Sequence, residues 1–212
     1  MDSPGFDALP RGRHQLTREQ VAASQRQRLL QGITEVVAEK GYVHTSVADV
    51  LKRAHVSRET FYEHFTDKQD CFLAAFETSA ELLLGAVTDA VGPPELPALE
   101  RFDQVLTHYL DGLAADSARA RTFLLEVYAA GPAAASRRHE IQRQFVQLML
   151  RVLLDDRGWR DLPDPEFAAQ MVVGGVAAMV TGKVAAGDHA ALPGLRGPIM
   201  AHVRSLMPGS AE

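Results

Sequence analysis

The sequence predicts an all-α protein of about nine helices, in which a three-helix N-terminal unit with a helix-turn-helix precedes a larger helical unit. Apolar residues recur every three or four positions along most of the 212-residue chain, and no segment alternates convincingly as a strand would. Glycine, proline and aspartate fall between these periodic segments, where they break helices. The expected helices span residues 17–40, 46–54, 57–65, 68–91, 99–115, 117–130, 133–156, 165–186 and 195–206.

The first helix is predicted to begin at Thr17 and to stop at Gly41, since glycine commonly ends a helix. Its apolar stripe consists of Leu29, Leu30, Ile33, Val36 and Val37. Helical periodicity therefore places one side of this helix in a core and leaves the other side polar.

Three parts are expected along the chain. Residues 1–16 are short, contain proline and glycine, and are predicted to form a flexible basic arm. Residues 17–66 are predicted to form the helix-turn-helix domain and residues 67–212 the larger helical domain. Gly92-Pro93-Pro94 marks a linker within the second part, because neither residue type continues a helix well.

The segment from Ser46 to Phe65 is typical of two short helices joined by a tight turn. Ser46 can cap the first helix, with Asp49 three residues later as its capping-box partner. One face of that helix is apolar and consists of Val47, Val50, Leu51 and Ala54. Ser57 is expected to cap the second helix, and Phe61 and Phe65, four residues apart, to anchor it to the core.

Four short strings within residues 26–76 occur in a fixed order: Glu39-Lys40-Gly41-Tyr42, Thr45-Ser46-Val47, VSRETFYEHF from Val56 to Phe65, and Asp67-Lys68. In this pattern the chain strongly resembles the TetR family of bacterial transcriptional regulators. The resemblance implies a helix-turn-helix that reads the DNA major groove, followed by helices for ligand binding and dimerisation. One departure is His55, where that family usually has a turn glycine, and a left-handed backbone there would cost roughly 1 kcal/mol.

The second helix of the motif carries the residues expected to read DNA, because its N-terminal side chains reach base edges. Arg58 is predicted to pair with guanine, and Thr60 to contact a base edge or a thymine methyl group. Glu59 either accepts a hydrogen bond from cytosine N4 or only stabilises the N-terminal end of the helix through the helix dipole. By resemblance to the family, phosphate contacts are expected from Tyr62, His64, Lys68, Thr45 and Ser46. The alternative is that all of these are solvated polar residues.

The charge distribution gives modest support to DNA binding. The net charge is −5, but residues 10–70 hold ten Lys/Arg and eight Asp/Glu, whereas residues 71–212 hold twelve and seventeen. In the basic arm, Arg11 and Arg13 are predicted to enter a minor groove, where narrowing deepens the negative potential. The alternative is a tail with incidental charge, and the nearby Asp2 and Asp7 weaken the arm.

Residues 92–212 resemble the family only in general layout, which implies a ligand cavity and a dimer interface. The helix over residues 165–186 is apolar or small on nearly every side, which is typical of a helix pressed against a partner or buried. With the last helix, it is the predicted two-fold four-helix dimer interface. The alternative is an internal core helix. A homodimer also follows from geometry, since two recognition helices must reach major grooves about 34–36 Å apart or more.

The predicted ligand-binding residues are aromatic, methionine and polar side chains on the middle helices, because ligand pockets are mainly apolar with few polar groups. They are Phe102, His108, Tyr109, Phe123, Glu126, Tyr128, Phe145, Met149 and Met171. The alternative for each is an ordinary core position. Glu126, inside the apolar run TFLLEVYAA, is the most suggestive, and its alternative is a salt bridge to a neighbouring arginine.

Other classes of protein find less support. The chain has no His-Glu-x-x-His or Gly-x-Ser-x-Gly motif and its histidines are scattered, so we expect no enzyme, no catalytic residue, no metal and no cofactor. The single cysteine, Cys71, fits a cytoplasmic protein, and the absence of an eighteen-residue apolar run predicts no membrane span. The resulting hypothesis is a repressor that binds a palindromic operator as a homodimer and is released by a small molecule. The alternative is an activator or a regulator without a ligand.

Overall fold

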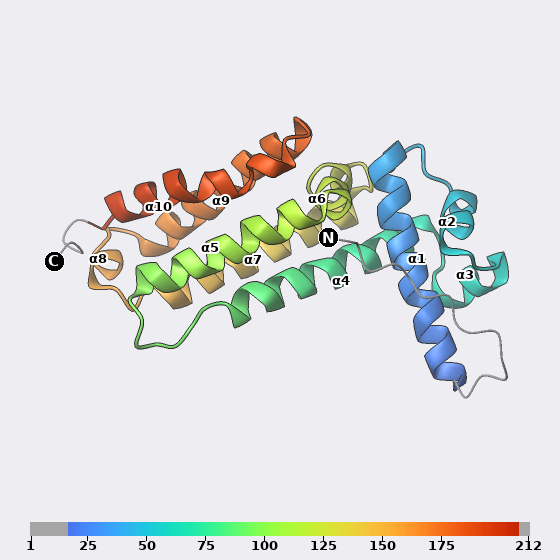
Figure 1. The fold of residues 1–212 in the computed structure, drawn as a ribbon, viewed down its shortest axis with the longest axis horizontal. Coiled ribbons are helices and arrows are strands. Elements are labelled where there is room, and N and C mark those ends of the chain that lie inside the picture. The colour runs from blue at the N-terminus through green and yellow to red at the C-terminus, as the bar shows by residue number, and fades with distance from the viewer. Residues whose placement is uncertain (1–16, 208–212) are drawn as a thin grey trace.

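The structure, a computed structural model, describes residues 17–207 and is all-α within that range (Figure 1). It contains ten α-helices, three short 3-10 helices and no strand over these residues. The α-helices are α1 (Arg18–Lys40), α2 (Val47–Ala54), α3 (Arg58–His64), α4 (Lys68–Asp89), α5 (Ala98–Ala115), α6 (Ser117–Leu124), α7 (Pro132–Leu153), α8 (Arg157–Arg160), α9 (Pro165–Ala185) and α10 (Arg196–Ser205). The 3-10 helices are η1 (Glu126–Tyr128), η2 (His189–Ala191) and η3 (Pro193–Leu195).

We call residues 17–76 the head and residues 77–207 the body. Helices α1, α2 and α3 lie at one end of the molecule, whereas α4, α5 and α7 run along its length with α9 and α10 on one side (Figure 1). The head core forms where one face of each short helix meets α1 and the start of α4. Its fully buried side chains include Leu29, Ile33, Val37, Val50, Phe61, Cys71 and Phe72.

The local signals in the head sequence are confirmed. Ser46 and Asp49 form a capping box at the start of α2, and Ser57 caps α3 through the backbone N–H of Thr60. Lys40 and Ser46 hold the pKa of the Asp49 carboxyl well below its usual value. His55 has φ 53° and ψ 47°, the left-handed conformation expected for the turn.

The turn of the motif is held by α1. Arg28 Nη1 donates to the backbone oxygens of Ala54 and His55, both at 3.3 Å, and so satisfies carbonyls that the end of α2 leaves free. Gly32 allows close approach of the two helices, because a Cβ there would lie 3.3 Å from the Cβ of Ala54. Contacts from Arg28 and Gly32 of α1 therefore help to hold the strained turn in place.

Replacing His55 with glycine should raise the free energy of unfolding by about 0.5–1 kcal/mol, because glycine relieves the left-handed strain but costs more backbone entropy. Thermal or denaturant unfolding measures the change. His55→Ala is the matched control, since it removes the imidazole and keeps the Cβ. If both variants stabilise the protein equally, the imidazole and not the backbone is responsible.

The body differs from the predicted helix pattern at two points. Residues 117–130 were expected as one helix, but α6 ends at Leu124 and the chain tightens into η1. Val127 and Ala130 are buried in the head core there, which holds the tighter turn in place. Residues 157–164 were expected as a loop but include α8, whose Trp159 is fully buried. A four-residue helix is too short to show periodicity, which is why nine helices were predicted and ten are found.

Three hydrogen bonds besides the continuous helix α4 join the body to the head. Thr122 Oγ1 donates to Thr34 O at 2.9 Å, and Gln69 Nε2 donates to Ala130 O at 2.5 Å. The carboxylate of Glu126 accepts from the backbone N–H of Tyr42 at 2.9 Å. The segment from α6 to the start of α7 thus contacts α1, the α1–α2 connection and the start of α4.

Two helices, α4 and α9, are long and apolar enough to cross a membrane by length and composition alone. The sequence reading found no such span because charged or polar residues interrupt every eighteen-residue window. In the structure, α4 forms part of both cores, and α9 packs one side on the body core. Both helices therefore contribute apolar side chains to the protein core.

Candidate functional site

The exposed side of α3 presents an arginine stacked on a tyrosine. The Arg58 Cζ lies 5.2 Å from the centre of the Tyr62 ring, and Arg58 Nη2 donates to the Tyr62 hydroxyl at 3.2 Å. Tyr62 is 47% exposed although it is large and aromatic. Its ring also packs edge-on against buried Phe61, so the pair is both anchored and accessible. An arginine held this way is preorganised for hydrogen bonding to DNA.

The other predicted contacts on this surface differ in exposure. Glu59 and Ser46 are exposed, whereas Thr60 is half-buried, and its hydroxyl lies 2.9 Å from that of Ser57. Arg11 and Arg13 lie outside the described residues. Lys52 was not predicted as a contact. It is exposed, and it makes no ion pair within residues 17–207.

Three predicted phosphate contacts, Thr45, Lys68 and His64, are buried or partly buried, and two of them donate hydrogen bonds within the domain. Thr45 is only 3% exposed, and its hydroxyl donates to Gly41 O at 2.8 Å. Lys68 Nζ donates to Tyr42 O at 2.8 Å and to Thr45 O at 2.9 Å, and burial lowers the pKa of its ammonium. Nε2 of His64 is buried without a hydrogen-bond partner among the described residues. Thr45 and Lys68 therefore position the start of α2 and do not form its surface.

Much of the positive charge beside the motif is neutralised locally. Arg53 pairs with Glu39 at 2.7 Å and with Glu35 at 2.9 Å, and these carboxylates raise the pKa of its guanidinium. Lys40 pairs with Asp49 at 2.5 Å. Such pairs fix α2 against α1, and they explain why a net charge of only +2 over residues 10–70 is a weak predictor of DNA binding.

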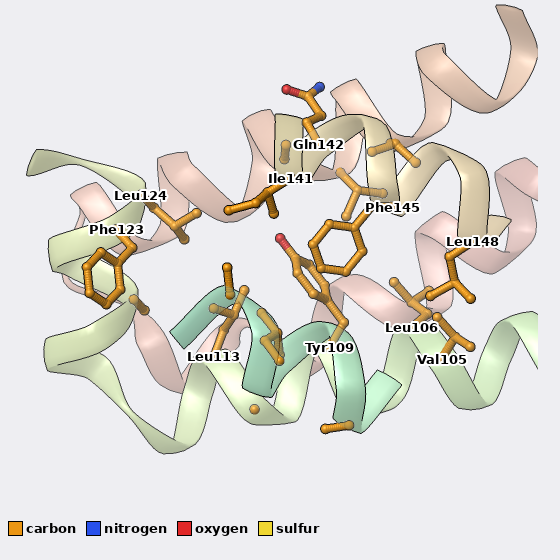
Figure 2. Close-up of a pocket in the computed structure, with 18 of the residues that line it drawn as sticks. Val105, Leu106, Tyr109, Leu113, Phe123, Leu124, Ile141, Gln142, Phe145 and Leu148 are labelled. Atoms are coloured by element: carbon orange, nitrogen blue, oxygen red, sulfur yellow. The ribbon is translucent and has the colours of Figure 1, made fainter. Parts of the chain in front are cut away.

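The body contains an apolar cavity of about 310 Å3 between α4, α5, α6, α7 and α9 (Figure 2). Nearly all of its wall is aliphatic or aromatic. The labelled wall residues in Figure 2 are Val105, Leu106, Tyr109, Leu113, Phe123, Leu124, Ile141, Gln142, Phe145 and Leu148. The volume lies at the lower end of the range for ligand sites, roughly 300–1,000 Å3.

Few polar groups reach this cavity. The Tyr109 hydroxyl points into its middle (Figure 2), and burial raises the pKa of this phenol to about 12. Arg138 also lines the wall, but its guanidinium donates to the Tyr128 hydroxyl at 2.9 Å and to Phe123 O at 3.3 Å. Arg119 pairs with Asp116 at 3.4 Å at the junction of α5 and α6. The guanidinium groups of the wall thus already have hydrogen-bond or ion-pair partners within the protein.

Five of the nine predicted ligand-binding residues line the cavity, namely Phe102, Tyr109, Phe123, Phe145 and Met149. The other four do not. His108 is exposed, with Nδ1 2.9 Å from Gln104 O, and Tyr128 and Met171 are exposed by 61% and 62%. Glu126 points to the Tyr42 N–H of the head, so its partner is a backbone amide and neither a ligand in this cavity nor an arginine.

One side of α9 is apolar and exposed. Phe167 and Met171 are about 60% exposed, and Met179 is 43% exposed, so large apolar side chains follow one another at helical spacing. A Cβ added at Gly175 or Gly182 would meet no atom within 4 Å. The opposite side, with Val172, Val176, Val180 and Val184, is buried. The helix is therefore half core and half open surface, which an apolar sequence alone does not distinguish.

Residues 29–75 match the family described as bacterial regulatory proteins, tetR family. The N-terminal domain is a TetR-family DNA-binding domain. The fold is that of the TetR-family transcriptional regulators. It is similar over 86% of this chain to the fatty acid degradation regulator FadR of Bacillus halodurans, with a TM-score of 0.74, 22% identity and 98% of that chain covered.

Two further solved structures are similar. FadR of Bacillus subtilis in complex with stearoyl-CoA has a TM-score of 0.73, 22% identity and the same coverages, 86% and 98%. A TetR-family regulator of Pectobacterium atrosepticum has a TM-score of 0.64 and 24% identity over 92% of this chain and 97% of the other. None of the curated proteins compared with this sequence matches it.

Sequence reasoning missed two polar residues of the cavity wall, Gln142 and Arg138, and named Lys68 without indicating its direction. Lys68 matches the family pattern, but a motif string does not show that its ammonium faces inward. Gln142 and Arg138 of α7 lie in a polar stretch whose inward side cannot be told without the neighbouring helices. The only available signal was their spacing, since Gln142 precedes Phe145 by three residues and Arg138 precedes Ile141 by three.

Proposed function

We propose that this chain is a homodimeric transcriptional repressor that binds a palindromic operator and is released by an apolar small molecule. The observation that carries the proposal is the accessible Arg58–Tyr62 pair on a capped recognition helix, within a domain that matches the TetR family. An arginine near the start of such a helix reaches guanine, and a neighbouring tyrosine hydroxyl reaches a phosphate. The protein is accordingly placed in the cytoplasm, in contact with DNA and not with a membrane.

The dimer is proposed to form through the open side of α9 together with α10. Four helices related by a two-fold axis bury the Phe167, Met171 and Met179 side chains, and the glycines allow close approach. The head lies at the opposite end of the body from α8 (Figure 1), so two heads can face the same DNA duplex. This assembly supplies the two recognition helices that a palindrome requires.

The effector is proposed to bind the apolar cavity. The B. subtilis FadR structure, similar in fold, holds stearoyl-CoA, a ligand with a long apolar chain. The cavity here has the matching character, since its wall is almost wholly aliphatic and aromatic. Binding lowers DNA affinity only if the effector prefers a conformation in which the heads no longer fit the operator.

The test of the proposed function is selection of genomic fragments with the purified protein across a salt series. A regulator of this kind recovers a short palindrome, and its affinity falls steeply as salt rises. Retention that is weak and independent of sequence, even after the protein is unfolded and refolded to remove bound ligand, contradicts the proposal.

Replacing Arg58 with alanine should weaken binding to the selected palindrome by about 1–3 kcal/mol and relax specificity at one base pair. Arg58→Lys is the matched variant, because it keeps the charge but not the bidentate geometry. Fluorescence anisotropy with single-base operator variants measures both effects. If Arg58→Lys discriminates between bases as the unaltered protein does, Arg58 contacts phosphate and not a base.

A further inference from the structure

We infer that the Tyr109 hydroxyl selects an uncharged effector with a carbonyl oxygen inside its apolar chain, such as an ester. This inference rests on the proposed function and adds the chemistry by which the cavity distinguishes its ligand.

The phenol is held in place by packing. Tyr109 lies on α5, and its ring meets the Phe145 ring of α7 edge-on, with 5.4 Å between centroids and an interplanar angle of 66°. Figure 2 shows the hydroxyl directed into the middle of the cavity. It makes no hydrogen bond to any residue between 17 and 207. A rigid polar group is thus presented in an otherwise apolar space.

The hydroxyl acts as a donor. With its pKa raised to about 12 by burial, the phenol keeps its proton at any physiological pH. Arg138 also acts electrostatically on Tyr109, and its positive charge favours the negative end of a ligand dipole beside the hydroxyl. A hydrocarbon that fills the cavity covers this donor without supplying an acceptor, whereas a ligand that brings an acceptor keeps the donor hydrogen-bonded.

The charges of the wall argue against a free carboxylate at this point. Arg138 already donates to Tyr128 and Phe123, and Arg119 pairs with Asp116. An anion beside Tyr109 would exchange its hydration for one neutral donor and the attraction of a guanidinium whose N–H groups already donate elsewhere, so a neutral acceptor loses less hydration on entering this apolar cavity. An ester or thioester carbonyl accepts the same hydrogen bond without a net charge.

The position of the hydroxyl places the carbonyl within the chain and not at its end. Figure 2 shows apolar side chains on both sides of Tyr109, with Phe123 and Leu124 toward one end and Val105 and Leu148 toward the other. A ligand that fills the cavity has hydrocarbon on both sides of its acceptor. An ester of a medium-length acid with a medium-length alcohol has this form.

Three probes of similar length test the inference with the full-length protein: butyl pentanoate, decane and decanoate below its micelle concentration. Displacement of a fluorescent apolar dye measures their affinities. Tyr109→Phe, which removes one oxygen atom, should weaken binding of the ester about tenfold, the factor expected of one buried hydrogen bond, and leave decane binding unchanged. The ester should also bind more tightly than decanoate, because the carboxylate loses the hydration of its charge in the cavity.

Tyr128→Phe is the comparison variant, because it removes a phenol hydroxyl outside the cavity and so shows how far the acceptor of Arg138, and not the Tyr109 hydroxyl, determines ester binding. Ester binding that Tyr109→Phe does not weaken, an equal weakening of decane binding, or tighter binding of decanoate than of the ester would each overturn the inference while leaving the cavity as an effector site. If none of the three probes binds, both the inference and the proposed effector site fail. Thermal unfolding of Tyr109→Phe shows whether the variant is folded.

Discussion

Replacing Met171 with arginine should convert the proposed dimer to monomers and lower operator affinity roughly 100- to 10,000-fold, the factor by which linking two binding modules raises avidity. Met171 is 62% exposed at the centre of the apolar side of α9, between Phe167 and Gly175. A charge at the centre of a two-fold interface faces its own copy, and burying two like charges without partners is costly.

Light scattering gives the mass of the variant in solution, and anisotropy compares a full palindrome with a single half-site. Half-site affinity should change little, because Met171 belongs to α9 of the body and not to the head. Leu154→Arg at the end of α7 is the matched control, since it adds the same charge at a partly exposed apolar position off α9. A Met171→Arg protein that stays dimeric would show that the interface lies elsewhere.

Much of the fold was predictable because local chemistry determines it. The capping box of Ser46 and Asp49, the stop at Gly41 and the left-handed His55 depend on a few neighbouring residues, and all are present in the structure. Helix α9 shows the limit of this reasoning. Its composition is apolar on every side, so the packing of α6, α7 and η2 against it decides which half is buried.

The site was less predictable than the fold, because residue type does not give direction. Thr45, Lys68 and Glu126 are polar residues in suggestive positions, yet each is used to join one part of the chain to another. Their partners are backbone groups, which carry no signature in the sequence. For the cavity, the apolar residues were predictable in kind, but the neighbouring helices determine which of them face one another.

Replacing Glu126 with alanine should lower the free energy of unfolding by about 1–3 kcal/mol, since it leaves the buried Tyr42 N–H without its acceptor. It should also reduce the effect of a cavity ligand on operator affinity. Glu126 follows Phe123 by three residues, and Phe123 both lines the cavity and packs on Phe72 and Phe76 of the head. A ligand that moves Phe123 therefore moves η1 and the carboxylate with it.

The contacts continue to the DNA-facing side. The Tyr42 ring packs edge-on against the Phe72 ring, with 5.0 Å between centroids. The Lys68 ammonium donates both to the Tyr42 carbonyl and to the Thr45 carbonyl, which lies one residue before the Ser46 cap of α2. A path of direct contacts thus runs from the cavity wall to the helix-turn-helix. Contiguity alone does not establish coupling, so the decisive quantity is the ratio of operator affinities with and without ligand.

Glu126→Gln is the matched variant, because its amide oxygen still accepts from Tyr42 while the negative charge is lost. Denaturant unfolding should therefore rank the proteins as unaltered, then Glu126→Gln, then Glu126→Ala, and the affinity ratio should follow the same order. Suppose that Glu126→Ala is destabilised as expected but keeps the full affinity ratio. The bond to Tyr42 then only holds the head on the body, and the effector signal travels through the continuous helix α4, which contributes buried residues to both cores.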